Sequence, residues 1–316
     1  MDSFDGRLAV VTGGGTGMGR ELVIQLAAAG ASVATCDVNL DTLAETAELA
    51  AKGAPDTVRI TTHRCDVSDA AAMDRFRDEV LAQHGTDHVH LLFNNAGIGG
   101  GGSFLTATRE EWERTFGVCW GGVYNGCRSF LPLLVAAPEG HLVNTSSVNG
   151  FWASLGPGVP HTAYSSAKFA VKGFSEALLE DLRLHAPHVE VSVVMPGHIG
   201  TDIVINSGQI HGEGKAEAER AASIRAGMEQ RGFPSEGFDD EAVLSLVTAM
   251  GEAFRDNAPM SAAEAATVIL DGVRAGEWRI LVGEDAKALD ERVRADPLSV
   301  YGPEAGGLDS IVLGAG

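Results

Sequence analysis

The chain has 316 residues, 45% hydrophobic and 21% charged, a balance typical of a globular protein rather than a disordered or fibrous one. Its 23 Lys and Arg residues against 43 Asp and Glu residues give a net charge of −20, which disfavours nucleic acid and anionic membranes as partners. The four cysteines lack metal-ligand spacing, and neither a signal peptide nor an apolar stretch of roughly 20 residues is recognisable. We expect a cytoplasmic protein with reduced thiols and no metal site.

Short apolar runs alternate with helical patterns along the first two thirds of the chain. The predicted strands are residues 8–11, 32–36, 58–65, 89–93, 142–145, 189–195 and 279–282. The predicted helices are residues 19–29, 40–52, 70–84, 110–134, 163–185 and 262–273. This alternation predicts an α/β fold, a doubly wound parallel sheet of the Rossmann-like kind, forming a single domain over residues 1–316.

Residues 198–260 interrupt the alternation. They contain two charged helical stretches, 216–230 and 241–254, between loops with Gly and Pro. The segment follows the carboxyl end of a strand, where ligands bind in open α/β sheets, so a helical lid over the substrate is one interpretation. A peripheral helical decoration is the other, and we give the two equal weight.

A glycine cluster, Thr12-Gly13-Gly14-Gly15-Thr16-Gly17-Met18-Gly19, lies directly between the first predicted strand and the first predicted helix. Glycine allows a tight turn and lets a pyrophosphate approach the N–H groups at the helix start. The spacing differs from the commonest dinucleotide fingerprint, but the strand–helix setting is the one that such a site needs. We therefore predict a dinucleotide cradle containing Gly13, Thr16, Gly17, Met18 and Gly19.

Asp37 ends the second predicted strand. A carboxylate at this place accepts hydrogen bonds from both ribose hydroxyls and repels the 2′-phosphate of NADP. Thr16 occupies a loop position where an Arg or Lys could have paired with that phosphate. Both observations favour NAD as the cofactor.

Tyr164 and Lys168 are four residues apart in a predicted helix and project from one face about one turn apart. A neighbouring ammonium favours phenolate and lowers the phenol pKa from about 10. The pair is suited to acid–base chemistry, and with a dinucleotide it indicates hydride transfer at an alcohol carbon.

Several motifs follow one another along the chain: Thr12-Gly13-x-x-x-Gly17-x-Gly19, Asn94-Asn95-Ala96-Gly97, Ser147, Tyr164-x-x-x-Lys168 and Pro196-Gly197. With these motifs, which appear in the family's order, the chain resembles the short-chain dehydrogenase/reductase family. The likeness covers residues 7 to 202, with looser similarity over 261–283. It implies that Tyr164 exchanges the alcohol proton, that Lys168 lowers its pKa and holds the nicotinamide ribose, and that Ser147 binds the substrate oxygen. Ser146 is the alternative to Ser147.

The resemblance also implies further contacts with NAD. Asp66 and Val67 would meet the adenine, and Asn94 the adenosine ribose. Ile199 and Thr201 would meet the nicotinamide amide and the phosphates. Family members are commonly homodimers or homotetramers, so we expect one of these assemblies, formed through the long helices 110–134 and 163–185.

The chain departs from the family pattern at two places. Cys119 stands where the family usually has Asn, which helps to hold a water that links Lys to solvent, and Asn125 lies on another helix face. The gap from Ser147 to Tyr164 is long and places Phe151, Trp152 and His161 near the substrate. Two further questions stay open: Phe151, Trp152 and Trp120 line an apolar pocket or form core, and His161 and His198 bind substrate or are incidental.

The leading functional hypothesis is transfer of a hydride between NAD(H) and a secondary alcohol or ketone, with a hydrophobic or cyclic small molecule as substrate. One alternative, motivated by Cys119, is an NAD-binding protein without turnover. Another is redox-neutral chemistry, such as that of an epimerase or dehydratase, on the same fold.

Overall fold

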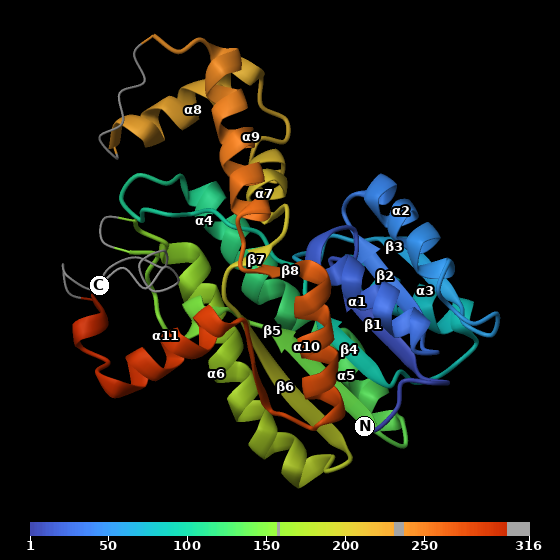
Figure 1. The fold of residues 1–316 in the computed structure, drawn as a ribbon. Coiled ribbons are helices and arrows are strands. Elements are labelled where there is room, and N and C mark those ends of the chain that lie inside the picture. The colour runs from blue at the N-terminus through green and yellow to red at the C-terminus, as the bar shows by residue number, and fades with distance from the viewer. Residues whose placement is uncertain (157–158, 231–236, 302–316) are drawn as a thin grey trace.

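The computed structural model describes residues 1–156, 159–230 and 237–301. A seven-stranded sheet runs through its centre, in the order β3-β2-β1-β4-β5-β6-β9, with every neighbouring pair parallel (Figure 1). The strands are β1 (Leu8–Thr12), β2 (Ser32–Asp37), β3 (Ile60–Arg64), β4 (Leu91–Asn94), β5 (Gly140–Thr145), β6 (Val189–Pro196) and β9 (Arg279–Val282). The doubly wound parallel sheet is thus confirmed, and its order reverses between β1 and β4.

The helices that connect the strands cover both faces of the sheet. They are α1 (Gly17–Ala28), α2 (Leu40–Ala51), α3 (Ala70–His84), α4 (Arg109–Phe116), α5 (Gly122–Ala136), α6 (Thr162–His185), α10 (Ala262–Arg274) and α11 (Glu284–Ala295). Short helical segments are also present: a π-helix at Gly117–Gly121 and 3-10 turns at Val148–Gly150 and Ser299–Tyr301. Within the described residues, no helix is long and apolar enough to cross a membrane.

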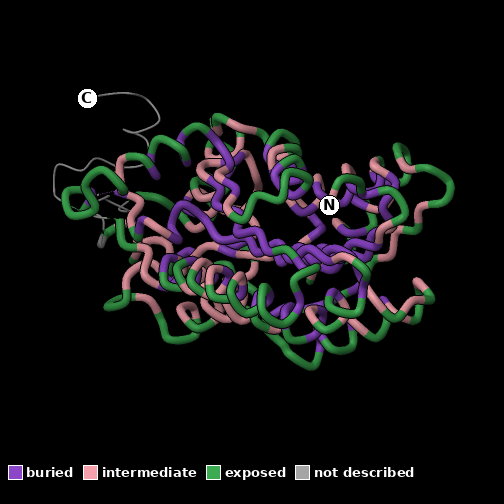
Figure 2. Tube along the Cα trace, turned by 90° about the horizontal axis from the view of Figure 1, so that it is seen from below, coloured by how far each residue is buried: buried purple, intermediate pink, exposed green. Residues whose placement is uncertain are grey.

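The core consists of two apolar layers, one on each face of the sheet. Alternate residues of a strand point to opposite faces, so Val10 of β1 packs with α3, α5 and α6, whereas Val11 packs with α1 and α10. Seen edge-on, the buried strands lie between two layers of helices with exposed outer surfaces (Figure 2). A sheet covered on both faces requires nearly continuous apolar strands, which is why the strands were recognisable in the sequence.

Residues 201–259 leave and re-enter the domain at one place. The two-residue strands β7 (Ile199–Gly200) and β8 (Met260–Ser261) pair in parallel at its two ends. Between them lie α7 (Ile203–His211), α8 (Glu217–Gln230) and α9 (Asp240–Asp256), which extend from the domain above the β7–β8 pair in Figure 1. The two helices expected in this segment are present, and α7 is an additional one.

Two other elements differ from the expected ones. The predicted helix 110–134 is helical throughout, but the π-helical turn at Gly117–Gly121 divides it into α4 and α5. Helix α11 was not predicted. Its buried residues Ala286 and Leu289 pack with Val148 and Trp152, a contact between distant parts of the chain.

Candidate active site

The glycine turn after β1 approaches the turn after β4 closely. Gly13 has a φ of +69°, and a Cβ placed on it would lie 2.7 Å from the Cα of Ala96. A Cβ on Gly19 would lie 2.0 Å from the carbonyl oxygen of Gly13. The Thr12 hydroxyl accepts the backbone N–H groups of Asn95 and Ala96, at 3.0 and 3.1 Å. The two turns therefore form one rigid edge at the point where the strand order reverses, the usual ligand position in such sheets.

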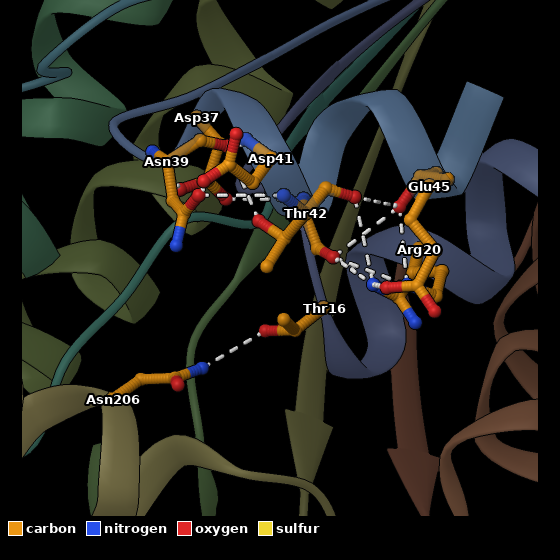
Figure 3. A network of polar contacts seen from close by, with 10 residues as sticks. Thr16, Arg20, Asp37, Asn39, Asp41, Thr42, Glu45 and Asn206 are labelled. Carbon is orange, nitrogen blue, oxygen red and sulfur yellow. Dashed lines mark hydrogen bonds and ion pairs between the residues drawn. The ribbon is translucent and has the colours of Figure 1, made fainter.

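The N-terminus of α1 faces this edge with its N–H groups available. Thr16 is the N-cap residue but makes no capping hydrogen bond. Its hydroxyl instead accepts a hydrogen bond from the Asn206 amide of α7 at 3.0 Å (Figure 3). Thr201 approaches from the loop after β6, since a Cβ on Gly17 would lie 3.1 Å from its methyl carbon. An uncapped helix start of this kind suits a bound anion such as pyrophosphate.

Asp37 is held at the end of β2, beside the glycine turn. Its carboxylate accepts the backbone N–H groups of Gly15 and Asn39, at 3.0 and 3.2 Å. The nearby Arg20 guanidinium donates to the Gly15 carbonyl at 2.8 Å and pairs with Glu45 at 2.6 Å (Figure 3). Arg20 is thus paired with Glu45, and no ion pair to the Asp37 carboxylate is present among the described residues.

Ser147, Tyr164 and Lys168 come together at the carboxyl end of β5. The Lys168 Nζ lies 5.3 Å from the centre of the Tyr164 ring and donates to the Thr145 carbonyl at 2.9 Å. Ser147 accepts the backbone N–H of Asn149 at 3.1 Å. Ser146 donates to the Lys168 carbonyl at 2.8 Å and so fastens α6 to β5. Of the two serines, Ser147 is the one directed to Tyr164.

Burial dominates the protonation of this cluster. It raises the pKa of Tyr164 above its usual range, the nearby Cys119 acts in the same direction, and a hydrogen bond with Ser147 lowers it only in part. Burial also lowers the pKa of Lys168, and Cys119 opposes that change. The expected lowering of the phenol pKa is therefore not found, because desolvation outweighs the effect of the neighbouring groups.

Cys119 lies within the π-helical turn, next to the cluster of Ser147, Tyr164 and Lys168. It is fully buried, and its thiol donates to the Ile98 carbonyl at 3.1 Å. A Cβ on Gly97 would lie 3.5 Å from the Lys168 Nζ and 3.8 Å from the Cys119 sulfur. Asn125 points elsewhere and donates to the Val67 carbonyl at 2.9 Å. Asn125 therefore does not replace the missing Asn, as the helical spacing predicted.

The remaining predicted cofactor residues lie along the same edge of the sheet. Asp66 is exposed and accepts the N–H of Ser68 at 2.9 Å, whereas Val67 is buried. Ile199 is also buried in the core, so only its backbone faces the edge. Met18 is partly buried against the α1 face of the sheet. These positions fit contacts with a ligand that lies across the strand ends.

The side chain of Asn94 belongs to a buried hydrogen-bond network, and the expected ribose contact of this residue stays a prediction. It is 2% exposed, and its amide donates to Asn144 at 2.9 Å. Asn144 in turn donates to Ser175 of α6 at 3.0 Å. This buried network links β4, β5 and α6, and sequence reasoning missed it because asparagines of different elements carry no common spacing.

The structure shows the surroundings of the aromatic and histidine residues whose roles the sequence left undecided. Trp152 is buried and donates to the Val300 carbonyl at 3.0 Å, and Phe151 packs beside it. Trp120 packs against Phe174 of α6, with ring centres 5.4 Å apart. These three are packing residues.

The two histidines also differ in their surroundings. His198 hydrogen-bonds the Phe254 carbonyl at 2.7 Å, which ties it to α9. Of the two, His161 is the one that contacts Tyr164, with its ring centre 4.7 Å from that of the phenol.

A parallel sheet in this strand order, with a glycine turn and an uncapped helix at the point of reversal, defines a Rossmann-like dinucleotide-binding protein. The family model described as short chain dehydrogenase matches residues 7–210. The chain belongs to the short-chain dehydrogenase/reductase family and is an oxidoreductase of that family.

Its relatives support this assignment over most of the chain. "Putative oxidoreductase SadH" of Mycobacterium tuberculosis is 36% identical over 295 residues, 93% of this chain and 92% of that protein. Mouse epidermal retinol dehydrogenase 2 is 33% identical over 197 residues, 62% of this chain and 61% of that protein. A short chain dehydrogenase/reductase from Burkholderia phymatum, solved in complex with NAD, is 29% identical with a TM-score of 0.75, over 95% of this chain and 96% of the other.

Proposed function

We propose that the protein transfers a hydride between NAD(H) and a secondary alcohol or ketone, with Ser147, Tyr164 and Lys168 as catalytic residues. The observation that carries the proposal is their gathering at the end of β5, with Lys168 5.3 Å from the Tyr164 ring. The Ala96–Gly97 turn connects this cluster to the glycine turn, since it contacts Gly13 on one side and Lys168 on the other. A group bound along the glycine edge can therefore reach the phenol.

NAD(H), when bound, supplies or accepts the hydride. The residues present fit it: the open N-terminus of α1 suits a pyrophosphate, and Asp37 suits the two ribose hydroxyls. Asp37 also disfavours a 2′-phosphate, because Arg20 is paired with Glu45 and leaves the carboxylate charge unbalanced. The relative from Burkholderia phymatum was solved with NAD, which agrees with this choice.

The raised pKa of Tyr164 defines its state at the start of a reduction. A phenol that is neutral at neutral pH holds the proton that a ketone oxygen needs when it becomes an alcohol. Ser147 polarises the carbonyl by hydrogen bonding to the same oxygen. As the phenol gives up its proton, the adjacent Lys168 stabilises the phenolate that forms. In the direction of oxidation the same groups act in reverse.

We further propose that the substrate is hydrophobic or cyclic and that residues 198–260 cover it. Asn206 and Ser207 of α7 contact the two sides of the site, since Asn206 reaches Thr16 and Ser207 accepts the N–H of Gly99 at 2.8 Å. The mouse relative is named for retinol, an apolar alcohol, which supports the substrate class. The proposals about the lid and the substrate class can be tested independently of the proposed reaction type.

The test is a screen of apolar cyclic ketones with NADH, followed at the absorbance of the reduced cofactor. We expect turnover that falls at least 100-fold in Tyr164→Phe with little change in NADH affinity, because the phenol supplies the proton and not the binding. NADH labelled with deuterium at its transferable position should pass the label to the product. If product forms while the deuterium stays on the cofactor, the chemistry is redox-neutral. If NADH binds but no ketone is turned over, the non-catalytic alternative is favoured.

A further inference from the structure

Asp285, in the first turn of α11, is a buried acidic residue outside the cluster of Ser147, Tyr164 and Lys168. It is 8% exposed, and its Oδ2 accepts the backbone N–H of His198 at 2.6 Å. Its Oδ1 has no hydrogen-bond partner among the described residues. Burial of a carboxylate is costly unless hydrogen bonds or a helix N-terminus compensate for it. A buried carboxylate that uses one oxygen for a single backbone contact therefore needs an explanation.

The backbone on both sides of Asp285 leaves room for its carboxylate. A Cβ on Gly197 would lie 2.1 Å from the Oδ2, and a Cβ on Gly283 would lie 2.3 Å from the Oδ1. Gly283 also has a φ of +105°, a conformation that other residues rarely adopt. The carboxylate thus fills the gap between two turns, the one that follows β6 and the one that follows β9. Neither glycine could carry a side chain while Asp285 stays in place.

The N–H that Asp285 holds belongs to the first peptide beyond the end of β6. The preceding N–H, that of Gly197, donates to the Val282 carbonyl at 2.9 Å and so continues the pairing of β6 with β9. The His198 ring packs against Phe254 of α9, with ring centres 4.2 Å apart. The hydrogen bond to Asp285 therefore lies between the sheet and the excursion, at the point where the chain turns away from the sheet.

The loop over residues 197–201 connects the two halves of the proposed site. It begins at the end of β6, beside β5, where the Ser146 N–H donates to the Val194 carbonyl at 2.8 Å. It ends at Thr201, whose methyl carbon would lie 3.1 Å from a Cβ on Gly17 at the start of α1. A dinucleotide that reaches from the start of α1 to Tyr164 therefore runs along this loop.

The residue after Asp285 supports the other side of the same site. Ala286 is buried and packs with Val148 and Trp152, and Val148 directly follows Ser147. The first turn of α11 thus contacts the loop after β5 through Ala286 and the loop after β6 through Asp285. Because both loops belong to the proposed site, this one helical turn fixes their relative position.

We propose that Asp285 is a positioning residue for hydride transfer, which holds the loop after β6 as the wall for the nicotinamide end of NAD(H). This inference rests on the proposed function, because a bound dinucleotide gives the loop something to position. It predicts that Asp285 acts on the nicotinamide end of the cofactor and leaves the adenosine end, at Asp37 and the start of α1, unaffected.

Calorimetric titration with NADH and with ADP-ribose, which lacks the nicotinamide, separates the two ends of the cofactor. For Asp285→Ala we expect the dissociation constant of NADH to rise about tenfold, the size of one hydrogen bond to a charged group. The dissociation constant of ADP-ribose should change by less than about twofold, because its contacts lie elsewhere. Asp285→Asn keeps an acceptor oxygen for the His198 N–H and should restore most of the NADH affinity.

Asp290→Ala is the matched control, because Asp290 is equally buried in α11 but pairs with Arg279 and Arg294 instead of the loop. It should lower the melting temperature at least as much as Asp285→Ala does, with the ratio of the two dissociation constants unchanged. Asp285→Val, which fills the space without an acceptor, replaces Asp285→Ala if that variant does not fold. With a ketone that is turned over, the Asp285 variants without an acceptor should also lose at least about tenfold in kcat, because a misplaced reactant slows the chemical step.

The outcomes separate this inference from the proposed reaction. An equal rise in both dissociation constants, or an equal change of their ratio in Asp290→Ala, would overturn the positioning role of Asp285 even if ketones are reduced. If the ratio changes as expected while no ketone is turned over, the proposed reaction fails and the positioning role stands. If the wild type does not bind NADH, both are wrong.

Discussion

Replacement of Asp37 by Asn tests how the protein chooses its cofactor. Asn has nearly the same shape but only one acceptor oxygen, whereas Asp37 accepts the Gly15 N–H at Oδ2 and the Asn39 N–H at Oδ1, so the variant keeps one of these two hydrogen bonds. The larger change is the loss of the charge. We expect the wild type to bind NADH more tightly than NADPH, and the Asn variant to lose most of that difference.

The magnitude follows from Coulomb's law. Two unit charges about 4 Å apart repel by about 1 kcal/mol in water and by about 4 kcal/mol near a protein surface. Asp37 is half-buried and its neighbour Arg20 is already paired with Glu45, so an intermediate value of about 2 kcal/mol is appropriate. Because about 1.4 kcal/mol corresponds to a factor of ten, the preference for NADH should fall about 30-fold.

Fluorescence titration gives the dissociation constants of NADH and NADPH without any substrate. Asp41→Asn is the matched control, since it removes one charge from the adjacent first turn of α2 (Figure 3), and the backbone N–H of Asp41, which donates to Asn39, is kept in the variant. Screening by solvent and salt should limit the change that Asp41→Asn makes in the preference for NADH over NADPH to about twofold. An unchanged preference in Asp37→Asn, or an equal change in Asp41→Asn, would refute the reasoning.

Three other predictions concern the proton path, acid stability and assembly. Cys119→Asn should retain NADH affinity and change turnover less than Tyr164→Phe does, because Cys119 acts beside the cluster; equal losses in the two variants would contradict this. Hydrogen bonding to His141 lowers the pKa of Glu190 from 4.5 to about 2, so the interaction stabilises the fold fully above pH 4.5 and is lost as the pH falls toward 2. The difference in melting temperature between wild type and Glu190→Gln should shrink over that interval, and a difference independent of pH would exclude the pair as its source. The helices α5 and α6 should mediate a homodimer or homotetramer, which light scattering would detect, and a monomer at micromolar concentration would show that this expectation is wrong.

Much of the fold could be predicted because its signals are local. A strand covered on both faces, such as β1, is apolar at every position but its last, and the Tyr164–Lys168 pair follows from helical spacing alone. The glycine turn was recognisable because a strand and a helix flank it directly. These features need no knowledge of which distant segments meet.

The features that could not be predicted depend on contacts between distant segments. One side of helix α11 is buried, in part because Trp152 and Val148, far earlier in the chain, pack against its Ala286 and Leu289. The Asn94 amide belongs to the core because Asn144 lies opposite it on β5, a register that one strand cannot reveal. The direction of the Tyr164 pKa depends on how completely the assembled site excludes water, which the spacing to Lys168 does not report.

The β7–β8 pair joins the two ends of the excursion over residues 201–259. Backbone hydrogen bonds join its two stems at a single point, and Ser261 with Glu264 forms a capping box that starts α10 immediately afterwards. The sheet register is therefore insulated from what the excursion contains, and doubling its length would add only about 0.6 kcal/mol of closure entropy. Chimaeras that exchange the excursion at these stems test whether it sets the substrate range, and they also replace Thr201 and Asn206, which lie beside the glycine turn.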